Sequence, residues 1–175
     1  MNRLSPLLTS IAFTQAIAIE PRRAAPFFSR GRLHLFRGPP AKAQADFKQA
    51  AELEPKYAYH ALWLEIADRR NKTPSRLKQA VPHLDMKAWP APVVRLFLGE
   101  IPPEALLAAA DNANAATKQE QTCEANFYGG EFALSKGAKE EAARLFRVAL
   151  DTCPKTFLEA GAAHAELEML GAAPN

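Results

Sequence analysis

The sequence lacks most of what chemical sites and membrane spans require. Among its 175 residues are only two cysteines and four histidines, and it has neither an HExxH pair nor a glycine-rich phosphate loop. No apolar run approaches the ~18 residues expected of a transmembrane helix. The histidines are too scattered for a catalytic triad or a metal set, at His34, His60, His83 and His164. We therefore expect no enzymatic activity, no cofactor, no metal site and no membrane span.

The chain also lacks a dominant charge of one sign. Its formal charge of +3 comes from 22 basic and 19 acidic residues, well mixed along the chain. The nearest basic cluster, between Arg69 and Lys78, is typical of solvated helix ends. A nucleic-acid partner is not expected, because such proteins concentrate basic residues on one face.

What the chain does have is an internal repeat with a period of 34 residues. Prolines stand between helical patterns rather than inside them, where they would break a helix. A three-residue pattern recurs at this period, as Phe13, Ala16 and Pro21 and then as Phe47, Ala50 and Pro55. The sequence therefore predicts helix hairpins repeated along one chain.

Two hairpins are complete, over 24–57 and 123–156. In the first, Gly38 ends one helix and Pro39 begins the next. Small residues allow the two helices of each hairpin to approach closely, at Gly31 and Ala43 in the first and at Gly130 and Ala142 in the second.

The remaining segments are incomplete. We expect a half repeat over 5–21, a degenerate repeat over 58–86, a short helix pair over 90–111, a solvated loop over 111–122 and a capping helix over 157–171. The cap is given polar character by Glu159, His164, Glu166 and Glu168. The predicted fold is all-α: a single domain over 1–175, built as a right-handed α-solenoid of antiparallel hairpins.

The hairpin residues resemble the tetratricopeptide repeat (TPR) family. The positions that carry the resemblance are Phe27, Gly31, Ala43, Phe47, Ala50 and Pro55, then Gly130, Ala142, Phe146, Ala149 and Pro154. The resemblance implies a non-enzymatic protein that binds a peptide or protein partner along the first helix of each hairpin. The residues expected to line that concave groove are Phe28, Arg32, Leu35, Tyr59, Leu62, Trp63, Ile66, Arg69, Glu124, Phe127 and Glu131. Several of them, Leu62 and Trp63 above all, are equally explained as core between repeats.

A narrower resemblance runs from Trp89 to Gly171. The strings WPAPVVRLFLG, NFYGGEFALSKG and AARLFRVAL are similar to the C-terminal half of NlpI-like TPR lipoproteins of Gram-negative bacteria. That resemblance implies a periplasmic, homodimeric adaptor that holds a protease and cell-wall hydrolases together. This sequence departs from the family pattern, because no cysteine near its start could take a lipid and no clear export signal is present. A cytoplasmic location is the alternative.

The two cysteines bear on the compartment. Cys123 opens the first helix of its hairpin and Cys153 ends the second, so antiparallel helices bring the two residues close. A disulfide there would stabilise the hairpin by ~3 kcal/mol in the chain-entropy model. Two buried thiols in a reducing cytoplasm are the alternative.

The sequence is compatible with other functions and with other interpretations of its N-terminal stretch. The half repeat over 5–19 would let the chain associate with itself as a homodimer, and the chain would equally suit a regulatory segment of a larger enzyme or secretion system. The same N-terminal stretch resembles a weak signal peptide, although Gln15 interrupts its apolar run. The missing first helix of the half repeat also fits a chain truncated upstream of Met1.

Overall fold

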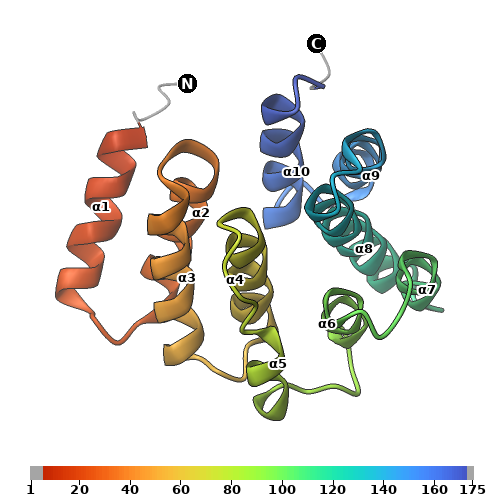
Figure 1. Cartoon of the computed structure of the whole chain (residues 1–175), viewed down its shortest axis with the longest axis horizontal. Helices are drawn as coiled ribbons and strands as arrows, with labels where there is room; N and C mark the ends of the chain where they lie inside the picture. The colour runs from red at the N-terminus through yellow and green to blue at the C-terminus, as the bar shows by residue number, and fades with distance from the viewer. Residues whose placement is uncertain (1–5, 173–175) are drawn as a thin grey trace. The chain divides into compact units, whose positions relative to one another are not determined.

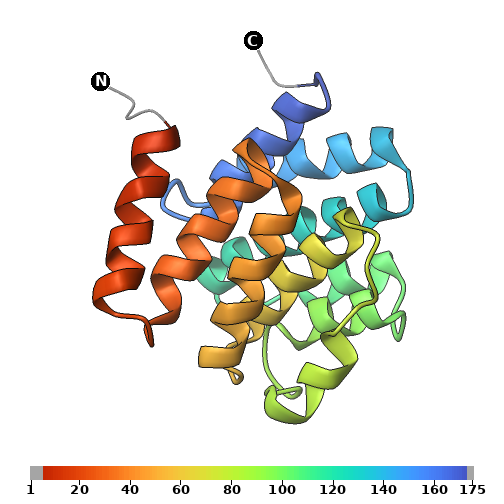
Figure 2. The same cartoon turned by 60° about the vertical axis from the view of Figure 1, so that its left-hand side comes forward.

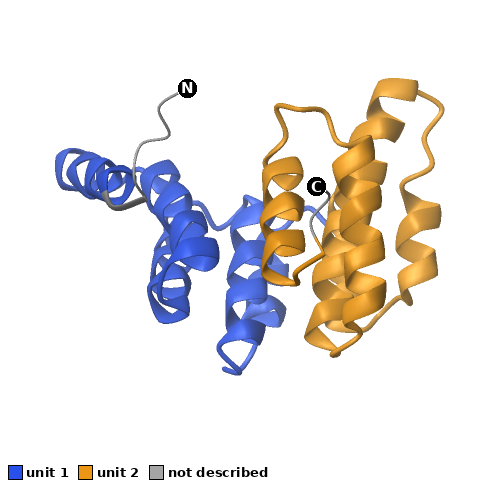
Figure 3. Cartoon of the chain, turned by 90° about the horizontal axis from the view of Figure 1, so that it is seen from above, with its two compact units in different colours: residues 1–86 blue, residues 87–175 orange. Residues whose placement is uncertain are grey.

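The chain divides into two compact units. The structure, a computed structural model, describes residues 6–172, with side chains from residue 8 onward. By internal contacts the units are Met1–Met86 and Lys87–Asn175, coloured separately in Figure 3. The division falls next to Trp89 and Pro90, at the junction between two predicted segments. That the two units fold together as one domain over 1–175 stays a prediction.

Unit 1 consists of helices that pack in chain order. Consecutive helices contact one another from the first to the fourth, and Figure 2 shows the first three side by side. The elements are α1 (Pro6–Ile19), α2 (Ala24–Arg37), α3 (Pro40–Leu53), α4 (Ala58–Arg70), α5 (Leu77–Ala80) and the 3-10 turn η1 (Val81–His83). These helices fall within the segments predicted as a half repeat, a full repeat and a degenerate repeat. That the segments are repeats stays a prediction, and residue 5 lies outside the described residues.

Unit 2 is organised around its longest helix. The helices, labelled in Figure 1, are α6 (Ala91–Leu98), α7 (Pro103–Ala109), α8 (Ala115–Ser135), α9 (Lys139–Thr152) and α10 (Leu158–Met169). Helix α8 contacts all four of the others. Residues 6–172 contain helices and turns but no strand, so the predicted all-α class is confirmed. None of the described helices is long and apolar enough to cross a membrane.

Glycine and proline set the ends of the helices, as the sequence predicts. Helix α3 begins at Pro40, where a missing N–H costs no hydrogen bond. Gly99 and Gly137, just after α6 and α8, have φ of +76° and +80°. This left-handed conformation strains residues that carry a Cβ, so glycine is the residue that ends these helices most readily.

Glycine also lets the two helices of each full hairpin approach closely. A Cβ added to Gly31 would come within 2.8 Å of the Phe47 ring, and one added to Gly130 within 2.6 Å of the Phe146 ring. The alanines predicted at these contacts, Ala43 and Ala142, are fully buried. In both hairpins a phenylalanine of the second helix therefore packs directly on the backbone of the first.

The predicted loop over 111–122 is wrong for most of its length. Helix α8 already begins at Ala115, and the Asn114 side chain accepts a hydrogen bond from the Thr117 N–H at its start. Lys118 forms an ion pair with Asp111 at 2.6 Å. The first turns of α8 are exposed, so the sequence has no apolar stripe there, yet Ala, Lys, Gln and Glu favour a helix without one.

The two cysteines lie at disulfide distance, as the hairpin geometry predicts. The Sγ atoms of Cys123 and Cys153 are 2.04 Å apart. Cys123 is in α8, and Cys153 is the residue that ends α9. The bridge therefore ties the open end of the α8–α9 hairpin.

Helix α10 buries polar residues that a terminal capping helix is expected to expose. Its position at the end of unit 2, against α9 and α8, agrees with a closing helix. Glu159 and Glu166, however, are 5% and 1% exposed. The Tyr128 hydroxyl donates to Glu159 at 3.4 Å. Two of the polar residues of this helix are therefore buried. A carboxylate can be buried where it accepts hydrogen bonds.

Candidate functional site

Arginines and aromatic rings gather on one face of unit 1. We call this surface the α2–α4 face and define it by Arg32, Phe36, Tyr59, Trp63 and Arg70. The Arg32 guanidinium carbon lies 5.4 Å from the centre of the Trp63 ring, and that of Arg70 lies 5.7 Å from the centre of the Phe36 ring. The rings of Phe36 and Trp63 meet edge to face at 6.2 Å. Cations stacked on aromatic rings are held in place while part of the guanidinium stays accessible.

The sequence spacing explains why these side chains meet. Arg32 and Phe36 are four residues apart on α2, which places them one turn apart on the same side of the helix. Tyr59, Trp63 and Arg70 follow at i, i+4 and i+11 on α4, again on one side. Trp63 is fully buried, whereas the other four are partly exposed. The face therefore has a rigid aromatic floor and a partly accessible surface.

An aromatic cluster supports the face from below. The Trp63 ring lies 5.7 Å from Phe28 and 5.8 Å from Phe47, and Phe28 also contacts His60 at 5.0 Å. Burial lowers the pKa of His60, although the Glu54 carboxylate acts in the opposite direction. A neutral imidazole is thus the form favoured inside this cluster at neutral pH. Packing of this density fixes the position of Trp63 and hence of Arg32 above it.

The residues predicted to line the groove divide between the two units. Eight are in unit 1 and three are in unit 2. The buried ones are Phe28, Leu35, Leu62, Trp63, Ile66, Glu124, Phe127 and Glu131. Arg32, Tyr59 and Arg69 remain partly exposed. That these eleven residues contact a partner stays a prediction.

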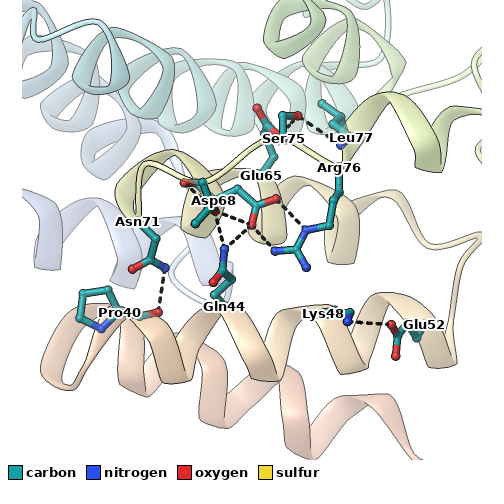
Figure 4. Close-up of polar contacts among 11 residues, drawn as sticks. Pro40, Gln44, Lys48, Glu52, Glu65, Asp68, Asn71, Ser75, Arg76 and Leu77 are labelled. Carbon is teal, nitrogen blue, oxygen red and sulfur yellow. Dashed lines mark hydrogen bonds and ion pairs between the residues drawn. The ribbon is translucent and has the colours of Figure 1, made fainter.

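Arg69 belongs to a polar network rather than to the α2–α4 face. Its Nε donates to the buried Glu65 carboxylate at 2.6 Å, and the Ser75 hydroxyl donates to the other oxygen of Glu65. Figure 4 shows the bond between Ser75 and Glu65 and, beside it, a second set of polar contacts around the fully buried Asp68. Asp68 accepts from Arg76 at 2.5 Å, and this partnership raises the pKa of the guanidinium.

The network has a structural role. Asp68 also accepts from the Gln44 side chain at 2.7 Å, which links α4 to α3. The Asn71 side chain donates to the Pro40 carbonyl at 3.1 Å. Together these bonds fasten the turn between α4 and α5 to the α3–α4 pair. A buried carboxylate with this many partners is explained by the fold, because an unpaired one would be strongly destabilising.

The three predicted residues of unit 2 have partners inside that unit. Glu124 accepts from the Trp89 indole N–H at 2.7 Å. Phe127 packs on Tyr128 at 5.0 Å and on Phe146 at 6.0 Å. Glu131 is 3% exposed. Structural contacts thus account for the positions of Glu124 and Phe127.

Phe36 and Arg70 are the members of the α2–α4 face that the sequence reasoning missed. The signal was available, because Phe36 follows Arg32 by four residues and Arg70 follows Tyr59 by eleven. Arg70 belongs to the basic cluster that the sequence analysis interprets as a solvated helix end. Neither spacing shows which helix lies opposite. Only the structure shows that Arg32 stacks on Trp63 and that Arg70 stacks on Phe36.

The described residues contain no group of three or more His, Cys, Asp or Glu side chains that could hold a metal ion. The cations stacked on aromatic rings in the α2–α4 face are an arrangement suited to binding through stacking and charge. The sequence matches no protein-family model.

Proposed function

We propose that this chain is a TPR-type adaptor that binds a peptide or protein partner without catalysing a reaction. In this proposal the hairpins of both units continue one α-solenoid with a right-handed superhelix. The Gly–Phe contact in both full hairpins supports it, because the close approach of two helices at a small residue is the feature behind the predicted repeat. The NlpI-like relationship suggested by the segment from Trp89 to Gly171 belongs to the same proposal.

The observation that carries the proposal is the α2–α4 face. Aromatic residues and arginine are enriched where proteins bind partners most strongly. Here the guanidinium groups of Arg32 and Arg70 stack on the rings of Trp63 and Phe36, and the aromatic cluster under Trp63 holds that ring in a fixed position. Pre-ordered side chains lose less entropy on binding, which favours a useful affinity from a small surface.

The compartment in this proposal is the bacterial cell envelope. Disulfides persist in oxidising compartments such as the periplasm and are rare in the cytosol. The Cys123–Cys153 pair at bonding distance supports this location. Mass spectrometry of protein isolated without reductant from its native compartment tests it, and two free thiols there would count against the envelope.

A photo-crosslinking experiment tests the binding surface. A photoreactive phenylalanine analogue replaces Tyr59, and the same analogue replaces the exposed Lys48 of α3 as the control site. We expect a discrete crosslinked partner in native extract from position 59 and none from position 48. Adding Arg32→Ala to the Tyr59 probe should abolish the crosslink. Equal crosslinking from both positions would contradict the assignment.

Self-association is a second candidate function, favoured by one observation on α1. Leu8, Ile11 and Ile19 are 54%, 46% and 79% exposed and share one side of the helix at i, i+3 and i+11. Helix α1 carries no charged residue over Pro6–Ile19. A symmetric dimer requires a surface that complements itself, and an uncharged apolar stripe does so without repulsion.

Sedimentation of the purified chain tests this second candidate. We expect a concentration-dependent dimer that Ile11→Glu converts to a monomer. The matched control is Gln79→Glu, which adds the same charge at an exposed position of α5 and should leave the dimer intact. A wild-type monomer at high concentration would exclude self-association through α1.

A further inference from the structure

A polar hollow lies between the first three helices of unit 1. Its volume is about 290 Å³, and a water molecule takes about 30 Å³ in the liquid. The described residues that line it come from all three helices: Ser10 and Thr14 of α1, Arg30 and His34 of α2, and Lys42, Ala45 and Asp46 of α3. The hollow is distinct from the α2–α4 face, and the adaptor proposal does not use it.

The single carboxylate in the hollow is already neutralised. Asp46, 5% exposed, accepts two hydrogen bonds from one guanidinium. The Arg30 Nε lies 2.9 Å from Oδ2 and Nη2 lies 2.7 Å from Oδ1. Arg30 Nη1 also donates to the Thr14 hydroxyl at 3.0 Å. The partnership with Asp46 raises the pKa of Arg30, so the pair stays ionised and its net charge is zero.

The other cationic groups of the hollow remain available. In the part of the chain that the structure describes, Lys42 makes no ion pair, and neither the His34 imidazole nor the Ser10 hydroxyl has a hydrogen-bond partner. With Arg30 and Asp46 cancelling, the lining carries the charge of Lys42, and a second positive charge when His34 is protonated. Such a lining favours an anion.

Donor groups that surround a ligand from several sides favour a tetrahedral oxyanion over a planar carboxylate. Ser10, His34 and Lys42 each line the hollow from a different helix. A phosphate group offers at least three acceptor oxygens, and lysine binds it as a point charge. The volume leaves room for an organic substituent beside the oxyanion.

We propose that the hollow between α1, α2 and α3 is a binding site for a phosphate-type oxyanion, either the free ion or a phosphomonoester. Lys42 supplies the fixed charge, and Ser10 and His34 donate hydrogen bonds. The Arg30–Asp46 pair holds the floor of the hollow in place and links α2 to α3.

The pKa of His34 distinguishes binding in the hollow from general binding to the protein surface. Burial lowers the pKa of His34, with Arg30 and Lys42 acting in the same direction and Asp46 in the opposite one; α1 contributes no charged side chain. A bound dianion stabilises the imidazolium, so it raises this pKa. His83 of η1 and His164 of α10, which do not line the hollow, should not respond.

Nuclear magnetic resonance titration of the full chain tests the site. Inorganic phosphate is added at constant ionic strength, and we expect saturable shifts at Ser10, His34 and Lys42. Lys42→Met should weaken the affinity by about tenfold or more, because it removes a hydrogen bond to a charged group. Lys48→Met, which removes an equal exposed charge from the same helix, should change it less than about twofold.

Further titrations separate the sources and the chemistry. Phenyl phosphate binding more tightly than inorganic phosphate assigns the site to an ester, and equal or weaker binding assigns it to the free ion. Sulfate does not change its charge near neutral pH, so its affinity should rise as the pH falls through the His34 pKa, and His34→Asn should remove this rise. Non-saturable shifts, shifts retained in Lys42→Met, or acetate binding as tightly as phosphate would overturn the proposal.

Discussion

The α2–α3 hairpin of unit 1 and the α8–α9 hairpin of unit 2 make the same central contacts. Gly31 meets Phe47 in the first as Gly130 meets Phe146 in the second. A second phenylalanine packs on each of these rings, Phe28 at 5.7 Å and Phe127 at 6.0 Å. The three pairs of matched positions, Gly31 and Gly130, Phe47 and Phe146, and Phe28 and Phe127, are each separated by the same number of residues in the sequence. The comparison shows that one packing arrangement is used twice.

The hairpins differ in what reinforces that arrangement. Arg30 and Asp46 form a bidentate pair in the first hairpin, and the matched positions of the second hold Gly129 and Leu145, which carry no charge. The disulfide of the second hairpin joins Cys123 and Cys153, where the first has Ala24 and Glu54. The central contact is thus common, whereas charge reinforces one hairpin and a covalent bond the other.

The largest effect expected is from loss of the shared phenylalanine. Phe47→Ala and Phe146→Ala each remove a fully buried ring and should cost about 3–5 kcal/mol of the free energy of unfolding. Hydrogen exchange followed by mass spectrometry should show faster exchange in the hairpin that carries the change. A loss below about 1 kcal/mol in either hairpin would show that Phe47 and Phe146 do not have the same role.

Loss of the disulfide should affect the second hairpin alone. Cys123→Ala with Cys153→Ala opens a loop closed at a separation of 30 residues, and the expected cost is about 3 kcal/mol. The measurement is urea unfolding with hydrogen exchange of each hairpin. Wild-type protein treated with reductant is the control and should show the same loss, with the α2–α3 hairpin unchanged. A loss spread evenly over both hairpins would contradict a local effect.

The charge pair of the first hairpin should matter less. Asp46→Asn leaves Arg30, whose side chain is 20% exposed, with a weaker acceptor, and we expect a cost of about 2 kcal/mol. Glu52→Gln is the matched control on α3, because it removes an exposed ion pair with Lys48. That control should cost less than about 0.5 kcal/mol in the same urea unfolding. Equal effects of the two variants would show that Asp46 acts as an ordinary surface charge.

The smallest effect concerns the additional turns of α8, which have no counterpart in α2. Asn114→Ala removes the side chain that accepts from Thr117 and should cost about 1 kcal/mol. Asn114→Ser, which restores a capping oxygen, should recover most of it. Circular dichroism and exchange at residues 115–120 provide the measurement, and an unchanged exchange rate there would show that the cap is dispensable.

The bounds of most helices could be predicted because glycine and proline mark them directly. Gly38, Gly99 and Gly137 are read from the sequence alone, and so is the approach at Gly31 and Gly130. The start of α8 could not be read in this way, because an exposed helix needs no apolar periodicity. Its sequence signals are the cap at Asn114, which resembles a loop residue, and helix-favouring residues that follow without an apolar pattern.

The candidate site was less predictable than the fold. Sequence spacing assigns residues to one side of a helix, and it placed Arg32 and Tyr59 correctly among residues with exposed surface. It does not tell a groove from a core, so Phe28 and Trp63 were predicted at a surface and lie in an aromatic cluster. The Arg30–Asp46 pair was missed because a contact between helices has no fixed sequence spacing.

The affinity of the α2–α4 face for its partner tests the central claim most directly. Once a crosslinked partner is identified, its dissociation constant is measured by calorimetry for the wild type, for Arg32→Ala with Tyr59→Ala, and for Lys48→Ala as the control. The account predicts a loss of about 100-fold or more for the double variant, with unchanged helicity and an unchanged constant for the control. An unchanged constant for a correctly folded double variant would contradict it.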